Sequence, residues 1–354
     1  MSQSFNNPLP GVPAVENPFF DRIFADPNVD EETRRVARDL RDHGFAIIDF
    51  PDDDFEVVAD SIKSQLHDQY DWDRWTETGY QDGHGLRIKD AWKFNDHVKR
   101  IASNRRVLEI LSTLFGRQAF PFQTLNFPVG TQQHYHTDSV HFSSVPERFM
   151  CGVWTALEDI GEEAGPLVYY PGSHKWPIFT NEHIGHCAAE NSGKITQHIF
   201  EPIWQSLVEM HGMKPQTFTP RKGQALIWLA NLLHGGMKQT DPTLTRWSQV
   251  THYFFEDCAY YQPMQSDPFY GHIKFLDVRN ALNGERVPNS YIGNQIPQDF
   301  IEASGSRFKN RLPEGFDAEL YFLANPDVRI SGERAEDHYL TYGRREGRPL
   351  RPRE

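Results

Sequence analysis

The sequence is poor in cysteine and has no long apolar run. Its three cysteines, Cys151, Cys187 and Cys258, are widely spaced and form no C-x-x-C pair, so we expect neither a disulfide framework nor a thiolate zinc site. No stretch approaches the roughly 18 apolar residues of a membrane-spanning helix, and no basic segment followed by an apolar one marks the N-terminus. We therefore expect no membrane span, no export signal and a reducing, cytoplasmic location.

Basic residues are in deficit as well. Asp and Glu number 49 against 36 Lys and Arg, which gives a formal net charge of -13. Such a charge repels polyanions, so nucleic acid is not expected as a partner. Two local basic runs, 99–106 and 344–353, are interpreted as solvated faces.

The hydrophobic pattern changes along the chain. Before residue 116, apolar residues have helical spacing in three segments, 30–44, 55–66 and 98–115. A strand-like apolar run, 45–50, lies between the first and the second of these segments. Short β-type runs then dominate up to residue 261; they are 120–127, 149–157, 167–170, 225–229 and 247–255. This order predicts an α+β, mainly β domain with a sandwich or small barrel at its centre.

Four regions are expected from composition and periodicity. Residues 1–29 show no sustained hydrophobic periodicity, so we expect an arm that lies on the domain or is disordered. The main domain is expected over residues 30–300. The segment 173–221 interrupts the series of predicted strands. We expect it to form either a lid-like insertion or a helix packed on the sheet. Residues 313–354 predict a small module of two short helices, with Gly343 as a C-terminal cap, that docks on the main domain or on a partner.

One motif has the spacing of metal ligands. In Gln133-His-Tyr-His-Thr-Asp138, His136 and Asp138 are two residues apart, and alternate side chains of a strand share a face. A remote histidine would complete a facial triad of two His and one carboxylate, which leaves three positions of an octahedral ion open. His234, in Trp228-Leu-Ala-Asn-Leu-Leu-His-Gly-Gly236, is the best candidate.

The choice of histidine is not unique, because an H-x-D pair arises easily by chance among 16 histidines. His134, His141 and His252 also lie near the predicted strands and are alternatives. Arg246 favours His234, since it follows on the next β-type run. A guanidinium there can make a bidentate contact to the distal carboxylate of a 2-oxo diacid.

Together these features resemble the phytanoyl-CoA dioxygenase-like family of iron(II) and 2-oxoglutarate oxygenases. The resemblance spans about 36–260, and Gly165-Pro-Leu-Val-Tyr-Tyr-Pro-Gly-Ser-His-Lys175 is its most specific part. The resemblance also rests on the H-x-D pair, the Trp154-Thr155 pair, His234, Arg246 and the opening helix and strand around 40–49.

The resemblance implies a double-stranded β-helix, or cupin-like jelly roll, with flanking helices. It implies iron(II), 2-oxoglutarate and dioxygen as cofactors, with succinate and carbon dioxide released as a C–H bond is hydroxylated or otherwise oxidised. The residues that it assigns are His136, Asp138 and His234 as metal ligands, Arg246 as the 2-oxoglutarate anchor, and Trp154, Lys89 and Ser248 as the lining of the cosubstrate pocket.

The expected substrate is a small molecule or a biosynthetic intermediate, which Gln123, Asn126, His141 and Phe142 are candidates to contact. A buried amide on a strand can equally be a satisfied core residue. Two alternative functions stay open, an iron-dependent halogenase and a non-catalytic jelly-roll binding or sensor protein. Asp138 argues against the halogenase, which has a small residue at that position. The 313–354 module resembles a small helical unit found at the ends of bacterial proteins, which points to a bacterial source.

Overall fold

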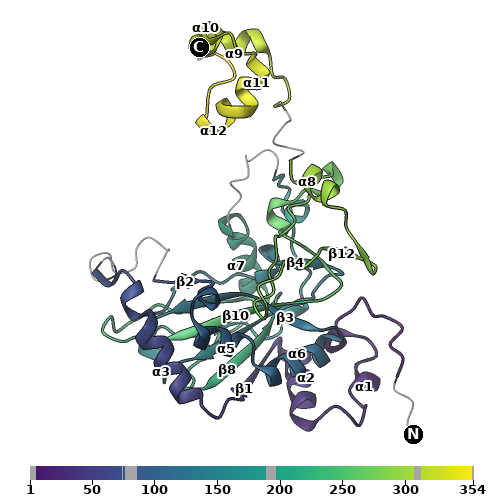
Figure 1. The fold of residues 1–354 in the computed structure, drawn as a ribbon, viewed down its shortest axis with the longest axis vertical. Helices are drawn as coiled ribbons and strands as arrows, with labels where there is room; N and C mark the ends of the chain where they lie inside the picture. Colours follow the sequence, from purple (N-terminus) through teal and green to yellow (C-terminus); the bar gives the residue numbers. More distant parts are fainter. Residues whose placement is uncertain (1–4, 74, 76–85, 189–196, 307–311, 353–354) are drawn as a thin grey trace. The chain divides into compact units, whose positions relative to one another are not determined.

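The computed structural model describes residues 5–73, 75, 86–188, 197–306 and 312–352 (Figure 1). Residues 1–4 of the expected arm, 189–196 of the expected insertion and the end of the second basic run lie outside the described residues. Two compact units form; the first comprises residues 1–179, 197–261 and 276–296, and the remaining segments form the second. None of the described helices is long and apolar enough to cross a bilayer.

The first unit is built on a six-stranded antiparallel sheet. Its strands, in spatial order, are β1 (Phe45–Asp49), β8 (Gln224–Leu229), β5 (Met150–Ala156), β10 (Ser248–Phe255), β3 (Ala119–Phe127) and β2 (Ile88–Lys89). Every strand of this sheet except the two-residue β2 lies on a predicted β-type run, because each has enough β-branched and aromatic residues to be read from sequence.

Smaller antiparallel sheets complete the strand set. The largest has the order β7 (Gln216–Phe218), β6 (Leu167–Tyr169) and β9 (His234–Gly236), and the two pairs are β11 (Ala259–Tyr261) with β4 (Ser143–Val145) and β12 (Ser290–Tyr291) with β13 (Asn294–Gln295). β7 falls within the expected insertion 173–221 and pairs with β6. The insertion therefore ends by supplying a strand to the sheet rather than lying outside it.

Alternation along the strands gives the large sheet two buried faces. On β8, Ile227 and Leu229 pack in one core and Leu226 and Trp228 in another. The first core lies against the helices, whereas the second lies between the six-stranded and the three-stranded sheets, because it includes Tyr169 of β6. This second face is the one that carries the candidate site.

The helices of the first core follow the predicted pattern with one break. They are α2 (Glu31–His43), α3 (Phe55–Leu66), α5 (Asp96–Ala102) and α6 (Arg105–Phe115). Asp30 caps α2, and Gly44 ends it at a φ of 86°. The predicted helix over 98–115 is two helices, because the Asn104 side chain accepts the backbone N–H of Val107 and caps α6.

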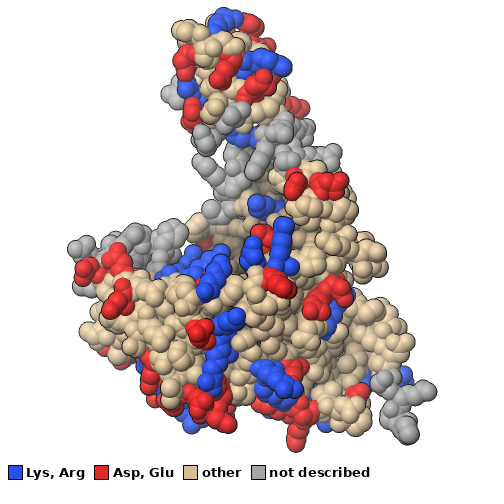
Figure 2. Space-filling model, in the orientation of Figure 1, with Lys and Arg blue, Asp and Glu red and all other residues tan. Residues whose placement is uncertain are grey.

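The N-terminal arm packs on this core. It contains η1 (Ala14–Glu16) and α1 (Phe20–Ile23), and Val15, Phe20 and Phe24 are buried. The basic run at 99–106 lies on the surface, where Arg100 pairs with Asp52 and Asp54. Figure 2 shows both basic and acidic side chains on the visible face.

Short helices fill the connections. The 173–221 stretch contains η6 (Ser173–Lys175), η7 (Asn181–Ile184), η8 (Gln197–Ile199) and α7 (Glu201–Met210). The remaining 3-10 turns are η2 (His67–Gln69), η3 (Ala91–Lys93), η4 (Asp138–Val140), η5 (Glu162–Ala164), η9 (Pro263–Gln265) and η10 (Pro268–Tyr270). The α7 helix forms within the expected insertion, and Trp204 is its buried residue.

The C-terminal residues are helical, as predicted, but with more breaks. The elements are α8 (Gln298–Ser306), α9 (Ala318–Ala324), α10 (Pro326–Ser331), α11 (Ala335–His338), the π-helix η11 (Tyr339–Gly343) and α12 (Arg344–Glu346). Tyr321, Val328 and Tyr339 form a small core. The prediction of Gly343 as a cap was wrong, because it is helical with φ -59°. A Cβ there would lie 2.1 Å from the Tyr321 hydroxyl, so close packing explains this glycine.

Candidate metal centre

His136 and His234 are brought together by backbone pairing. His136 N donates to His234 O at 2.8 Å, and His234 N donates to His136 O at 2.9 Å. This is an isolated bridge, so the predicted strand through the H-x-D motif was wrong: Asp138 begins the η4 turn instead. The turn still directs the carboxylate toward both imidazoles.

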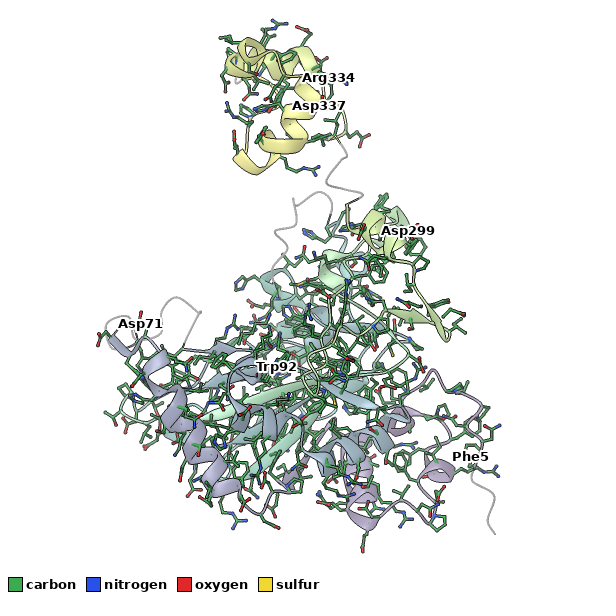
Figure 3. All side chains as sticks on the ribbon, in the orientation of Figure 1. Phe5, Asp71, Trp92, Asp299, Arg334 and Asp337 are labelled. Atoms are coloured by element: carbon green, nitrogen blue, oxygen red, sulfur yellow. The ribbon has the colours of Figure 1, made fainter. Side chains whose placement is uncertain are left out.

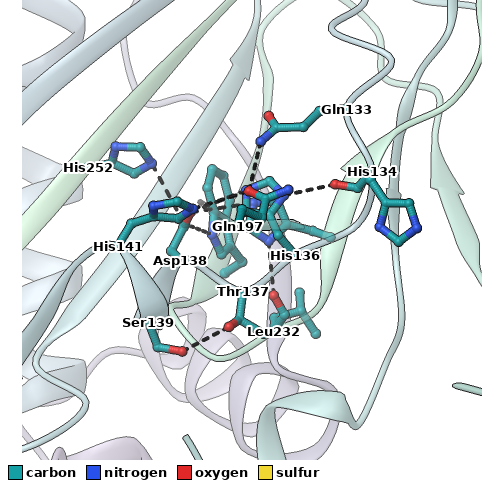
Figure 4. Close-up of polar contacts among 12 residues, drawn as sticks. Gln133, His134, His136, Thr137, Asp138, Ser139, His141, Gln197, Leu232 and His252 are labelled. Atoms are coloured by element: carbon teal, nitrogen blue, oxygen red, sulfur yellow. Dashed lines mark hydrogen bonds and ion pairs between the residues drawn. The ribbon is translucent and has the colours of Figure 1, made fainter. Parts of the chain in front are cut away.

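The three predicted ligands form one cluster. Their ligand atoms lie within 4.8 Å of one another, and no other group of at least three His, Cys, Asp or Glu of this kind occurs among the described residues. Asp138 Oδ1 lies 3.7 Å from His136 Nε2 and 3.9 Å from His234 Nε2. All three side chains are buried, and Figure 4 shows the Asp138 carboxylate beside His136. Their separations suit a single ion held between them.

Each imidazole is fixed by a carbonyl two residues before it. His136 Nδ1 lies 3.1 Å from His134 O, and His234 Nδ1 lies 2.9 Å from Leu232 O. A carbonyl accepts only, so Nδ1 carries the proton and Nε2 keeps a lone pair. Both Nε2 atoms face Asp138, as metal ligands oriented through their other nitrogen do.

Electrostatics favour the protonation states that bind a cation. Burial lowers the pKa of His136 to about 3, with His234 acting in the same direction, so this imidazole is neutral near pH 7. Burial alone would raise the pKa of Asp138, but the His234, His252 and His136 imidazoles and the Trp228 indole outweigh it and bring it to about 2. His136 therefore offers a neutral nitrogen, and Asp138 offers an ionised oxygen.

His252, one of the alternative ligands, lies on the other side of the Asp138 carboxylate. Its Nε2 is 3.7 Å from Asp138 Oδ2, the oxygen turned away from the other two histidines, and its Nδ1 donates to Gln123 Oε1 at 3.0 Å. Gln123, a predicted substrate residue, therefore reaches the centre through His252. The second oxygen also accepts the Trp228 Nε1–H at 2.8 Å.

The other two alternative metal ligands, His134 and His141, differ in how near they lie to the cluster. His134 is exposed, and its ring lies against the Tyr135 carbonyl, away from Asp138 (Figure 4). His141 lies beside the cluster, with its ring 6.1 Å from that of His136, and its Nε2 donates to Gln197 Oε1 at 3.2 Å. Gln133 donates to the same oxygen. The insertion therefore reaches the centre through Gln197, a residue that the sequence pattern did not single out.

The predicted cosubstrate residues share the face between the sheets. Arg246 is buried, donates to Gly165 O at 3.1 Å and lies 5.6 Å above the Trp154 ring. Ser248 is buried, and its Oγ has no hydrogen-bond partner among the described side chains and backbone. Along β10, Ser248 and His252 have the same parity, which puts them on one face.

Lys89 is exposed at the edge of the large sheet. It pairs with Leu125, which packs against the core between the sheets, so Lys89 points to the same side. Its charge is one of the influences that lower the pKa of His252, after burial and the neighbouring imidazoles. Lys89 therefore lies within electrostatic range of the centre.

The structure does not bring Asn126 to this face. Its amide donates to Gln249 Oε1 at 3.2 Å, and Gln249 in turn donates to Val98 O of α5 on the helix side. The core-amide alternative therefore describes this residue better than a substrate contact, although its Oδ1 is buried without a hydrogen-bond partner among the described residues. Phe142 lies on the site face, 5.4 Å from the His252 ring.

Comparison with known proteins gives one family and several structures. A family model described as "Phytanoyl-CoA dioxygenase (PhyH)" matches residues 22–242. No curated protein matches the sequence. Among solved structures, the alpha-ketoglutarate dependent carbocyclase SnoK from nogalamycin biosynthesis is 16% identical, with a TM-score of 0.48 over 67% of this chain and 88% of that chain. EctD from S. alaskensis, with 2-oxoglutarate and 5-hydroxyectoine, is 17% identical, with a TM-score of 0.46 over 65% and 77%.

Proposed function

Because the chain belongs to the phytanoyl-CoA dioxygenase family, whose cofactors are iron(II) and 2-oxoglutarate, we propose that it oxidises an unactivated C–H bond of a small molecule. Hydroxylation is the expected outcome, with release of succinate and carbon dioxide. The observation that carries the proposal is the buried cluster of His136, Asp138 and His234. Two nitrogens and one carboxylate on one side of an ion are the ligand set of non-haem iron(II) oxygenases.

The residues of the cluster fit an iron(II) ion. Nδ1 of each histidine is held by a carbonyl, and the carboxylate is ionised. When bound, iron(II) with 2-oxoglutarate and dioxygen supplies the oxidising power that breaks the C–H bond, as the cosubstrate is decarboxylated. The protein contributes the orientation of the ligands and their burial.

Arg246 is assigned to anchor the distal carboxylate of 2-oxoglutarate. Its guanidinium is buried beside Trp154, so a carboxylate bound there would be desolvated and strongly held. Ser248 Oγ is a further donor on the same face. Lys89, at the exposed edge, would add attraction for the dianion.

The two facing sheets support the double-stranded β-helix expected from the family. The core between them contains side chains of both sheets, including Trp154 and Phe218, as the layers of a sandwich do. Within such a fold we place the iron in the space between the two sheets, because His234 and His252 lie on strands of different sheets.

A small polar substrate is supported by the groups near the cluster. His141, Gln197 and Gln123 offer hydrogen-bonding groups, and Phe142 adds an apolar surface. These groups already bond to protein partners, but a long acyl chain could not use the donors and acceptors that they have left, and burying such atoms unpaired costs free energy.

Hydroxylation is tested by product analysis. We expect candidate small molecules to stimulate succinate release, and mass spectrometry in chloride buffer to show oxygen insertion or desaturation. A chlorinated product would contradict the role of Asp138, whose carboxylate fills the position that a halide would need. Iron binding without any turnover across a broad substrate screen would favour the sensor alternative.

A further inference from the structure

Trp228, Gly152 and His252 lie side by side across three strands. Gly152 on β5 is paired with Trp228 on β8 at one side and with His252 on β10 at the other. All three positions face the space between the two sheets, where Trp228 is almost fully buried. The middle position of this row is thus the one without a side chain.

The missing side chain at Gly152 makes room for the indole. A Cβ built on Gly152 would lie 2.1 Å from Trp228 Cζ2 and 2.4 Å from Cε2, distances that no packed pair of atoms tolerates. Gly152 is not among the glycines with positive φ, so backbone strain does not explain its presence. The indole therefore lies directly against the β5 backbone, and any larger residue would displace it.

In this position the indole N–H reaches Asp138. Trp228 Nε1 donates to Asp138 Oδ2 at 2.8 Å, the one hydrogen bond to this carboxylate from any described side chain. His252 Nε2, at 3.7 Å, lies beyond hydrogen-bond distance of the same oxygen. The two oxygens thus have separate surroundings, with the indole at Oδ2 and the two ligand imidazoles at Oδ1.

A carboxylate without such an anchor rotates broadly about its terminal torsion. It can then offer either oxygen, or both, to one ion, and a second oxygen would take a position that the cosubstrate or dioxygen needs. Neutral donors to the outer oxygen of a ligating carboxylate fix its orientation and contribute to metal affinity.

We propose that Trp228, in the space that Gly152 leaves, is a positioning residue that holds Asp138 as a one-oxygen ligand. The proposal rests on the iron site described above. Trp228 and Gly152 would then act in metal binding as well as in packing between the sheets.

The test is an anaerobic iron(II) titration of the full chain carrying Trp228→Phe, which keeps an aromatic ring and removes the donor. We expect iron affinity to fall by about 10-fold to 100-fold. Trp92→Phe is the matched control, because Trp92, labelled in Figure 3, is a buried indole of the helix-side core whose Nε1 has no partner among the described residues. The iron(II) affinity of the Trp92→Phe variant should equal that of the wild type.

A double-mutant cycle separates positioning from packing. Gly152→Ala should weaken iron binding by a similar factor in the wild-type background, because the new methyl group displaces the indole. In the Trp228→Phe background it should add little, since phenylalanine lacks the indole atoms that the methyl group would meet. With cobalt(II) as a spectroscopic probe, both single variants should change the visible spectrum of the bound ion, whereas Trp92→Phe should not.

The outcomes are distinct. If Trp228→Phe binds iron as tightly as Trp92→Phe, with the wild-type cobalt spectrum, the positioning role is wrong and the iron site stands. Equal losses in Trp228→Phe and Trp92→Phe would point to a loosened core and also overturn it. Failure of the wild-type chain to bind iron(II) or cobalt(II) would remove the proposed function and this proposal together.

Discussion

At the scale of single residues, the metal centre depends on short backbone contacts. His136 and His234 each lie against the carbonyl two residues upstream. This repeated contact selects the tautomer that leaves Nε2 available, so both ligands are oriented before a metal ion arrives. The pairing of the two histidine backbones then fixes the distance between the rings, with centroids 4.6 Å apart.

Arg246→Leu should raise the 2-oxoglutarate requirement and leave iron binding nearly unchanged. Removing one partner of a buried charge-assisted pair costs about 2–5 kcal/mol, which is at least about a 30-fold loss of affinity. Anaerobic 2-oxoglutarate titration of the iron-loaded variant measures this, with Arg221→Leu as an exposed control. An unchanged 2-oxoglutarate affinity in the folded variant would remove Arg246 as the anchor and make Lys89 the next candidate.

His174 gives the protein a pH dependence unrelated to iron. Its Nε2 donates to Arg41 O in the last turn of α2, and burial lowers its pKa to about 4. The unfolded chain takes up this proton from about pH 6.5 downward, so the contribution to stability is complete above that pH and is lost as pH falls toward 4. Over that range the loss is up to about 3 kcal/mol.

Urea unfolding of metal-free protein at pH 7.5 and pH 5 measures this effect. The His174→Gln variant should have a lower free energy of unfolding than the wild type at pH 7.5. Between pH 7.5 and pH 5, its free energy of unfolding should also fall by less than that of the wild type. The same pH slope in both proteins would show that His174 is not buried in its neutral form.

Several site residues were predictable at this scale, and others were not. The spacing of His136 and Asp138, taken together with the remote His234, predicted a cluster that the structure brings together, whereas the anchor role of Arg246 stays a prediction. Trp228, Gln197 and the place of His252 depend on strand register and on an insertion that folds back. No spacing rule in the sequence encodes those contacts.

At the scale of elements, the N-terminal arm is tied to the loops around the centre. Arg148 donates to Glu16 of η1 at 2.6 Å and to the carbonyls of His174 and Trp176. Asn231 donates to the same two carbonyls and accepts from Ser139, the neighbour of Asp138. The arm therefore supports the turn that carries the carboxylate.

Glu16→Ala should destabilise the protein by about 1–3 kcal/mol, because it leaves the largely buried Arg148 guanidinium without its carboxylate. Glu109→Ala is the control, since its pair with Arg105 is exposed and contributes little. Chemical denaturation of both variants compares the two. Equal losses would show that the arm is not held by this pair.

The elements with strong periodicity were predicted well. The long strands of the large sheet and the helices α2 and α3 lie on the expected runs. Strands β2 and β9 are two and three residues long, too short to show alternation. The Asn104 cap divides α5 from α6 although the apolar stripe continues across it.

At the scale of the whole molecule, the residues assigned to the site all belong to the first unit. Deleting residues 313–354 should therefore leave iron and 2-oxoglutarate binding within about twofold of the full chain, a change well below 1.4 kcal/mol. The expectation is checked by titrating the truncated protein alongside the full chain. Loss of either ligand in soluble truncated protein would show that the module contributes to the site.

The division into units could not be predicted in full. The second unit joins 180–196 and 262–275 to the C-terminal residues, segments far apart in sequence with no shared periodicity. The family, by contrast, was predictable, because a few residues with defined chemistry carry it, and the family comparison over residues 22–242 confirms it.

The most direct test is an anaerobic titration with iron(II) and 2-oxoglutarate, followed by visible absorption. We expect one iron per chain and a weak charge-transfer band in the wild type, and the loss of both in His234→Ala. His252→Ala is the matched variant, with an imidazole beside the same carboxylate but outside the ligand cluster, and it should retain iron. Normal iron binding and band in His234→Ala, with their loss in His252→Ala, would contradict the assignment of the centre.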